Sequence, residues 1–320
     1  MEQKKPTLSI IIPAYNVEKY IVAALDSVLG QTILPEEMII INDGSTDRTS
    51  DLLKKYTDYP NFHIITIHNN GAGPARNLGR MLANHEYIYF FDSDDMLRNT
   101  FVADIKNMIS TSNHPDLILF GSKNFSDEKN YYKFLSENKH KSAGLFKKND
   151  RLLTKLSKNK ELFSSPCLYV SKKAIWAKNR IHFPPVVHED EVVIASLIAI
   201  SQSTLVTSKV FFLRRVRPGS IMTSGICSDN AEGILRLLNY TQEFMHHNRT
   251  LIRPDLATWR FRLGMFAIHY FKLCKVSDTR IAWRQLFSAL LASRSIICFV
   301  LFPITVLRSI RKNIVVGMKW

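Results

Sequence analysis

In the N-terminal part of the chain, short apolar runs alternate with longer stretches in which apolar residues recur at helical spacing. The runs, expected to be strands, are 8–12, 38–41, 62–67 and 87–91. The stretches between them, expected to be helices, are 17–29, 46–56 and 74–83. Strands rich in Ile and Val, each followed by a helix, are typical of βαβ units. The pattern therefore predicts an α/β fold with a mainly parallel central sheet flanked by helices.

Polar residues follow each apolar run, at the carboxyl end of each expected strand. In chain order the clusters are Pro13-Ala14-Tyr15-Asn16, Asn42-Asp43-Gly44-Ser45, Asn69-Asn70-Gly71 and Asp92-Ser93-Asp94-Asp95. Parallel sheets bind ligands at this edge, where the carboxyl ends of the strands meet. Each cluster alone is also compatible with a turn or a helix N-cap. All of them at one edge predict a binding site.

The aspartates after the run 87–91 form the most acidic of these clusters. Asp92, Asp94 and Asp95 crowd together, and like charges this close raise one another's pKa unless a cation or buried donors neutralise them. Carboxylate oxygens favour Mn²⁺ or Mg²⁺ over zinc. The cluster therefore predicts such a metal and a phosphate-bearing substrate. A helix N-cap followed by acidic first-turn residues is the alternative.

Taken in order, the motifs at 8–16, 41–47, 71–79 and 91–95 resemble those of family 2 glycosyltransferases. The resemblance implies the GT-A fold, in which one α/β domain binds a nucleotide-diphosphate sugar. It also implies transfer of the sugar with inversion, with a divalent metal as cofactor. In the third motif, Asn77 and Gly79 are implied to shape the loop.

The resemblance also implies which residues meet the donor. Beside the nucleotide it places Pro13, Tyr15, Asn16, Asp43, Arg76 and Asp92. Asp43 is implied at the uracil edge, because a carboxylate only accepts hydrogen bonds and the uracil N3–H donates one. Asp92 is implied at the ribose, and Asp94 at the metal that bridges the two phosphates. For Asp95 a metal, sugar or capping role is left open.

A second acidic cluster, Val187-His188-Glu189-Asp190-Glu191, opens an apolar stretch of helical length. An inverting transferase needs a base that deprotonates the acceptor hydroxyl, away from the metal. The cluster resembles the Glu-Asp motif of the family, which implies Asp190 as that base. Helix-capping acids are the alternative, and Glu191 stays a second candidate.

Arginines precede a Gly-Ser-Ile sequence further along the chain: Arg214, Arg215 and Arg217. In the family, a similar strand carries arginines that meet the departing diphosphate. Guanidinium groups suit this role because they stay charged and offer forked donors. The resemblance assigns Arg215 and Arg217 to the diphosphate. Which of the three faces it stays open, because Arg214 stands where the family has an aromatic residue.

Length and composition fit one catalytic domain with an extension. The chain has 320 residues, 46% of them hydrophobic, which is enough to bury a sizeable core. We predict a catalytic domain over 1–225, with a nucleotide-binding half at 1–121 and an acceptor half at 122–225. Within it, 124–148 is expected to be an insertion over the sheet edge. Residues 226–320 are expected to form a helical, basic extension, with helices at 257–273, 281–291 and 296–310.

The net charge of +15 is concentrated near the C-terminus, where 251–320 hold 12 of the 43 Lys and Arg but only 2 of the 28 Asp and Glu. The uncharged segment 295–307 would reach about 20 Å as a helix, too short for a hydrocarbon core of about 30 Å. Pro303 is also expected to interrupt it. An interfacial segment on an anionic cytoplasmic leaflet is predicted, with a buried helix on the catalytic domain as the alternative.

The cysteines show no metal-binding spacing, which fits a reducing compartment. They are Cys167, Cys227, Cys274 and Cys298. The first residues lack the apolar region of a signal peptide. We therefore expect a cytoplasmic protein in peripheral contact with the inner face of the membrane.

The sequence thus predicts an inverting glycosyltransferase of hexosyltransferase type. It would move one sugar from a nucleotide-diphosphate donor, expected to be a UDP-sugar, to a glycan or lipid-linked glycan in capsule, lipopolysaccharide or exopolysaccharide biosynthesis. A nucleotide-sugar pyrophosphorylase would carry a glycine-rich loop where Pro13 to Asn16 stand. A nucleic-acid-binding protein would not need carboxylates at strand ends, and a processive synthase would show several membrane spans.

Overall fold

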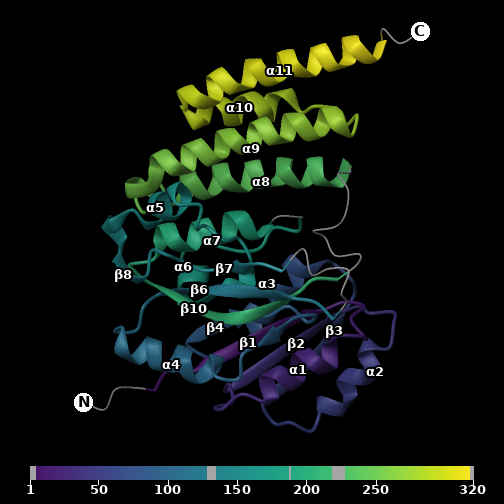
Figure 1. Cartoon of the computed structure of the whole chain (residues 1–320), viewed down its shortest axis with the longest axis vertical. Coiled ribbons are helices and arrows are strands. Elements are labelled where there is room, and N and C mark those ends of the chain that lie inside the picture. The colour runs from purple at the N-terminus through teal and green to yellow at the C-terminus, as the bar shows by residue number, and fades with distance from the viewer. Residues whose placement is uncertain (1–4, 128–134, 187–188, 218–227, 318–320) are drawn as a thin grey trace.

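The computed structural model describes residues 5–127, 135–186, 189–217 and 228–317, with side chains up to residue 306 except those of 228–230. Figure 1 shows a central sheet with helices on both sides and a stack of C-terminal helices beyond it. The strands are β1 (Leu8–Ala14), β2 (Glu37–Asp43), β3 (Phe62–Ile67), β4 (Tyr87–Phe90), β5 (Met96–Leu97), β6 (Leu117–Phe125), β7 (Glu137–Asn138), β8 (Gly144–Lys147), β9 (Tyr169–Lys172) and β10 (Ser203–Arg215). The helices are α1 (Ile21–Leu29), α2 (Thr49–Leu53), α3 (Ala72–Leu82), α4 (Phe101–Thr111), α5 (Leu152–Lys158), α6 (Ala174–Lys178), α7 (Glu189–Ile200), α8 (Ser228–His247), α9 (Leu256–Val276), α10 (Trp283–Ser293) and α11 (Ile296–Gly317).

The central sheet has the predicted parallel core. Its main path runs β3-β2-β1-β4-β9-β6-β10-β5, and the pairs β3–β2, β2–β1 and β1–β4 are parallel. Strand β9 pairs antiparallel with both β4 and β6, which makes the sheet mixed. Every residue of β1 and β2 is buried, because helices such as α1 and α3 cover opposite faces of the sheet (Figure 1). The predicted α/β fold is confirmed.

Two predicted helices begin later than their apolar spacing indicates. Helix α1 begins at Ile21 rather than at residue 17, and α2 begins at Thr49 rather than at residue 46. In the loop before α1, backbone N–H groups donate to side chains of the neighbouring loop 47–49 instead of to a helical turn. The Val17 N–H donates to Thr49 Oγ1 (2.9 Å), and the Glu18 N–H donates to the Asp47 carboxylate (3.0 Å). These hydrogen bonds between the two loops replace those of a first helical turn.

The stretch predicted as an insertion over the sheet edge, 124–148, belongs to the sheet where the structure describes it. Strand β7 pairs antiparallel with β6, and β8 pairs antiparallel with β10. Short strands at the margin of a sheet need few apolar side chains. With two and four residues, β7 and β8 are too short to show a periodic pattern in the sequence.

The predicted C-terminal helices are present as α9, α10 and α11, preceded by α8. The prediction that Pro303 interrupts the last of them is wrong, since Pro303 lies inside α11. A proline removes one backbone donor from a helix, and packing before it keeps this helix continuous. Cys298 is fully buried, and the ring of Phe302 meets Phe271 edge-on at 5.3 Å between centroids.

The C-terminal helices pack on the rest of the molecule. Helix α8 contacts α7, and α9 contacts both α8 and α5, so the layers continue beyond the sheet as in Figure 1. The predicted domain boundary at residue 225 lies outside the described residues. Within the described part of the chain, none of the helices has the length and apolarity needed to cross a membrane.

Candidate active site

The first two motifs lie side by side at the carboxyl ends of β1 and β2. Asn16 Oδ1 accepts hydrogen bonds from the N–H groups of Thr46 (2.8 Å) and Asp47 (3.4 Å). Its φ of 50° is a conformation that Asn tolerates better than most residues. Pro13 lies within β1, and Tyr15 is 48% exposed. Asn16 therefore holds the second loop while Tyr15 stays accessible to a ligand.

Asp43 joins the second motif to the third. Its buried carboxylate accepts the backbone N–H groups of Asn70 (2.9 Å) and Gly71 (2.8 Å). Gly71 has a φ of 91°, which residues with a Cβ rarely adopt. The carboxylate thus shapes the loop before α3, and its contact with uracil stays a prediction.

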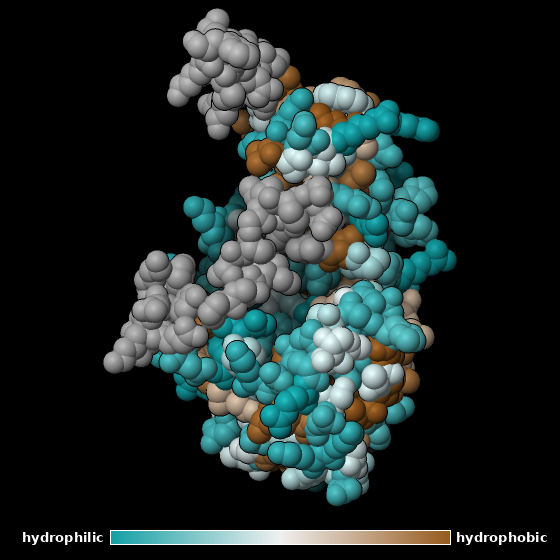
Figure 2. All heavy atoms as spheres, turned by 90° about the vertical axis from the view of Figure 1, so that its right-hand side faces the viewer, coloured by the Kyte–Doolittle hydropathy of each residue, from teal (hydrophilic) through white to brown (hydrophobic). Residues whose placement is uncertain are grey.

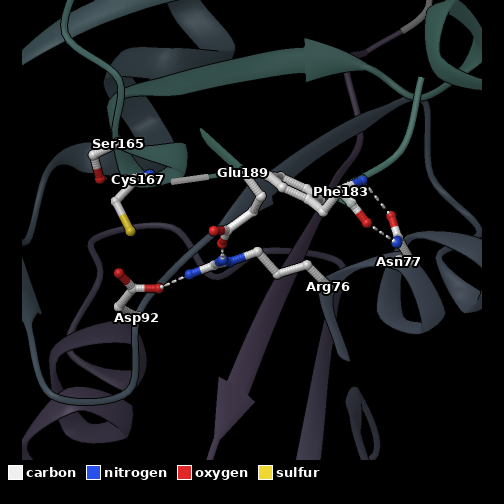
Figure 3. Close-up of polar contacts among 7 residues, drawn as sticks. All are labelled: Arg76, Asn77, Asp92, Ser165, Cys167, Phe183 and Glu189. Atoms are coloured by element: carbon white, nitrogen blue, oxygen red, sulfur yellow. Dashed lines mark hydrogen bonds and ion pairs between the residues drawn. The ribbon is translucent and has the colours of Figure 1, made fainter. Parts of the chain in front are cut away.

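Asn77 and Gly79 were expected to shape this loop. Both lie within α3, and their contacts are with other parts of the chain. Asn77 donates to the Phe183 carbonyl (2.7 Å) and accepts the Phe183 N–H (2.9 Å), as Figure 3 shows. Gly79 faces the sheet, where an added Cβ would lie 2.3 Å from Cγ2 of Ile11. Asn77 therefore ties α3 to the segment before α7, and Gly79 lets α3 approach β1.

Arg76 of α3 joins the donor motifs to the acidic cluster of α7 (Figure 3). Its guanidinium donates to Asp92 at 2.8 Å and to Glu189 at 2.7 Å, and its side chain is only 7% exposed. Burial pushes the pKa of Asp92 up, but the charge and hydrogen bond of Arg76 outweigh burial and leave this pKa below its usual value. Asp92 is therefore ionised. Contact between Arg76 and the nucleotide stays a prediction.

The carboxylates of Asp92 and Asp95, with the Cys167 sulfur, lie within 4.8 Å of one another. Burial, followed by the charges of Asp94 and Asp92, raises the pKa of Asp95 well above its usual value. A divalent cation would relieve this repulsion, so the carboxylates fit the predicted metal. Burial and the same carboxylates also raise the pKa of Cys167. Its sulfur is a soft ligand, which the hard cations Mn²⁺ and Mg²⁺ do not favour.

Asp94, the predicted metal ligand, pairs with an arginine. Arg217 Nε donates to Asp94 Oδ2 (2.8 Å), and Arg215 Nε donates to the Asp94 carbonyl (2.8 Å). Both guanidinium groups lie over the ring of Tyr20, at 5.1 Å for Arg217 and 5.3 Å for Arg215. The structure thus brings these two arginines to the aspartates. Metal binding by Asp94 stays a prediction.

Asp190 lies in the first turn of α7, between Glu189 and Glu191. Burial, and then the charge of Glu189, raise its pKa to about 7 against the opposing charge of Arg76. A carboxyl whose pKa is near neutral can exchange a proton with a hydroxyl at ordinary pH. Residues 187–188 and the Gly-Ser-Ile sequence after the arginines lie outside the described residues.

Some side chains at the site were not predicted from the sequence. Glu189 had a usable signal, because it is the acidic neighbour of Asp190. Tyr20 and Cys167 had none, because each stands alone in the sequence and reaches the aspartates only through folding.

A mixed sheet flanked by helices, with carboxylates and arginines at the ends of its strands, is typical of a glycosyltransferase of the GT-A fold. Residues 9–176 match the family model described as glycosyl transferase family 2, and the chain belongs to this family.

Relatives of this chain include bacterial glycosyltransferases. Chondroitin synthase of Escherichia coli is 44% identical over 96 residues, which are 30% of this chain and 14% of that protein. Poly(ribitol-phosphate) beta-N-acetylglucosaminyltransferase TarS of Staphylococcus aureus (strain Mu50 / ATCC 700699) is 26% identical over 238 residues, which are 72% of this chain and 39% of that protein. The chain thus matches well under half the length of these two relatives.

A solved structure extends the comparison of the fold. The crystal structure of S. aureus TarS 1-349 in complex with UDP-GlcNAc has a TM-score of 0.62 and 22% sequence identity. The match covers 90% of this chain and 88% of that one. It therefore includes C-terminal helices as well as the sheet, and it confirms the GT-A fold.

Proposed function

We propose that this chain is an inverting glycosyltransferase of hexosyltransferase type, which moves one sugar from a nucleotide-diphosphate donor to a glycan or lipid-linked glycan. A UDP-sugar is the expected donor, since the similar TarS structure was solved with UDP-GlcNAc. Relatives such as chondroitin synthase support a role in the assembly of capsule, lipopolysaccharide or exopolysaccharide.

The observation that carries the proposal is the bridge from Asp92 through Arg76 to Glu189, with distances of 2.8 and 2.7 Å. It joins the donor motifs to the residue next to Asp190. An inverting transfer requires a base that faces the same site as the donor but is separate from the groups that hold the diphosphate. Asp190, with a pKa of about 7, suits that role.

In the proposed reaction, Asp190 accepts the proton of the acceptor hydroxyl as that oxygen attacks the anomeric carbon. The bond between the sugar and the diphosphate breaks on the opposite side. Arg215 and Arg217, which stay charged, donate hydrogen bonds to the diphosphate. Asp94 would hold Mn²⁺ or Mg²⁺, which when bound neutralises charge on the leaving group, and Asp92 would contact the ribose.

A screen of UDP-, GDP- and dTDP-sugars for hydrolysis that depends on Mn²⁺ or Mg²⁺ tests the proposal. Asp190→Asn should lower turnover by about 10²-fold or more, because general bases contribute about 10²–10⁴-fold. UDP binding, measured by calorimetry, should stay nearly unchanged. Asp94→Asn should weaken metal-dependent UDP binding.

Asp58→Asn is the matched control, since Asp58 is exposed and lies outside the motifs. Wild-type turnover by Asp190→Asn would remove Asp190 as the base and direct attention to Glu191. Failure to hydrolyse any of the sugar nucleotides, with any of the metals, would count against the function itself.

We also propose that the outer face of the C-terminal helices contacts an anionic cytoplasmic leaflet. Figure 2 shows hydrophobic residues among hydrophilic ones at the end of the molecule that holds these helices. The exposed apolar side chains of α10 and α11 include Phe287, Leu291, Ile296, Ile297, Val300 and Ile304. At the turn between α9 and α10, a surface cavity of about 910 Å³ is lined by Lys275, Arg280 and Arg284, among others. Apolar side chains next to cations suit an anionic surface.

A further inference from the structure

The first turn of α7 meets an arginine on each side of Asp190. Glu189 accepts from Arg76 of α3 (2.7 Å). Glu191 meets Arg262 of α9, whose Nη2 donates to the Glu191 carbonyl (3.1 Å) and lies 3.8 Å from the Glu191 carboxylate. Consecutive acids repel one another. The two arginines therefore neutralise the outer acids of the turn and leave the central one to the reaction.

Burying the charged side chain of Arg262 costs free energy, which argues that this residue has a functional role. Its side chain is 19% exposed, and Nε is buried without a hydrogen-bond partner among the described residues. Burial lowers the pKa of Arg262, and the charge of Glu191 works against that decrease. A buried guanidinium stays charged, and a partly satisfied buried charge adds little to stability. Packing against the ring of Phe266, at 5.5 Å, supports its position.

The start of α9 is anchored so that Arg262 points to α7. Asp255 accepts hydrogen bonds from the N–H and the hydroxyl of Thr154 in α5, at 3.0 and 2.6 Å. The Thr154 hydroxyl also lies 2.7 Å from that of Thr258. Trp259 is fully buried. Arg262 follows Thr258 by four residues, one helical turn, so both lie on the same face of α9.

We propose that Arg262 is a positioning residue of the active site, through which the C-terminal helical extension holds the first turn of α7 and, with it, Asp190. Arg76 holds the same turn from the side of the donor motifs. The extension thus completes the catalytic site in addition to any role at a membrane. This inference rests on the proposed function, because it takes Asp190 as the base.

Arg262→Gln in the full chain tests the proposal, with Arg260→Gln on the same helix as control. Turnover of the sugar nucleotide found in the donor screen, with water as acceptor, should fall by about 10- to 100-fold, since small displacements of a catalytic group cost this much. The affinity for UDP with Mn²⁺ should stay unchanged, because the donor motifs are intact. Arg262→Lys should recover part of the rate. Hydrogen exchange at 193–196, whose N–H groups bond to the carbonyls of the first turn of α7, should increase in Arg262→Gln.

The melting temperature separates positioning from folding. A lower melting temperature with wild-type turnover per folded molecule would overturn the proposal. If the wild-type chain turns over none of the sugar nucleotides, the proposed function fails. Unchanged exchange at 193–196 would then overturn the proposal for Arg262, and faster exchange would support it.

Discussion

At the scale of single residues, ion pairs with arginines give the acidic side chains of the site different protonation properties. Arg76 keeps Asp92 ionised and pairs with Glu189, and Arg217 pairs with Asp94. Asp190 instead has a pKa of about 7, because burial and Glu189 raise it more than Arg76 lowers it. Two environments thus separate carboxylates suited to cations from a carboxyl suited to proton transfer.

Replacing Arg76 should move the pH dependence of the reaction. Asp190 acts as a base only when ionised, so the rate falls as pH decreases through its pKa. Arg76→Gln removes a positive charge that lowers this pKa, and the acid limb of kcat/KM against pH should therefore shift to higher pH. Arg76→Lys, which keeps the charge, should shift it less.

Arg80→Gln, one turn further along α3, is the control and should leave the pH profile in place. Losing one partner of a buried ion pair costs about 3–5 kcal/mol, so the folded fraction of each variant has to be measured. An acid limb that does not move in folded Arg76→Gln would contradict the electrostatic role of Arg76.

At the scale of elements, the distance between α3 and β1 decides where Arg76 lies. Gly79, three residues after Arg76, faces the fully buried Ile11 of β1. Without a Cβ at that position the helix approaches the sheet closely. The side chains of α3 then reach both the strand end at Asp92 and the start of α7.

Gly79→Ala should destabilise the protein by about 1–3 kcal/mol. The added Cβ would lie 2.3 Å from Ile11 Cγ2, which overpacks this buried contact. Alanine is favoured over glycine in a helix by about 1 kcal/mol, so a net loss would show that packing prevails. Denaturant unfolding measures the change. Met81→Ala, at an exposed position of the same helix, should stay within about 0.5 kcal/mol. A net gain for Gly79→Ala would contradict the close approach.

The elements also show what periodicity can and cannot predict. The strand expected at 62–67 has the same bounds in the structure, because its apolar run is set by local sequence and ends at polar residues. The start of α1 was predicted four residues too early. Donors from Val17 and Glu18 bond to the loop 47–49, and local spacing carries no information on such contacts.

At the scale of the whole molecule, charge and exposed apolar surface both lie towards the C-terminal end. The outer side of α11 exposes Ile296 (81%) and Ile297 (58%), whereas Cys298 on the opposite side is buried. A helix that is apolar on both sides is usually buried. Together with the cations at the α9–α10 turn, this supports contact with an anionic lipid surface.

Sedimentation of the full chain with vesicles checks this contact. Phosphatidylglycerol vesicles should bind the protein and phosphatidylcholine vesicles should not, and binding should weaken as salt increases. The double substitution Ile297→Glu and Val300→Glu should reduce binding. Ile33→Glu and Leu34→Glu, at exposed apolar positions outside the helices, form the control and should not. Equal binding to both lipids, or an unaffected double variant, would contradict the membrane contact.

The sequence by itself determined the α/β class, the position of each polar motif directly after a strand, and the carboxylates at the edge of the sheet. These follow from local periodicity and from the rule that parallel strands present their carboxyl ends together. Only the tertiary structure decided which charges meet, as when Arg76 bonds to Glu189 and Arg262 to Glu191. Those partners are 113 and 71 residues apart, and the packing of distant helices, which no local pattern encodes, brings them together.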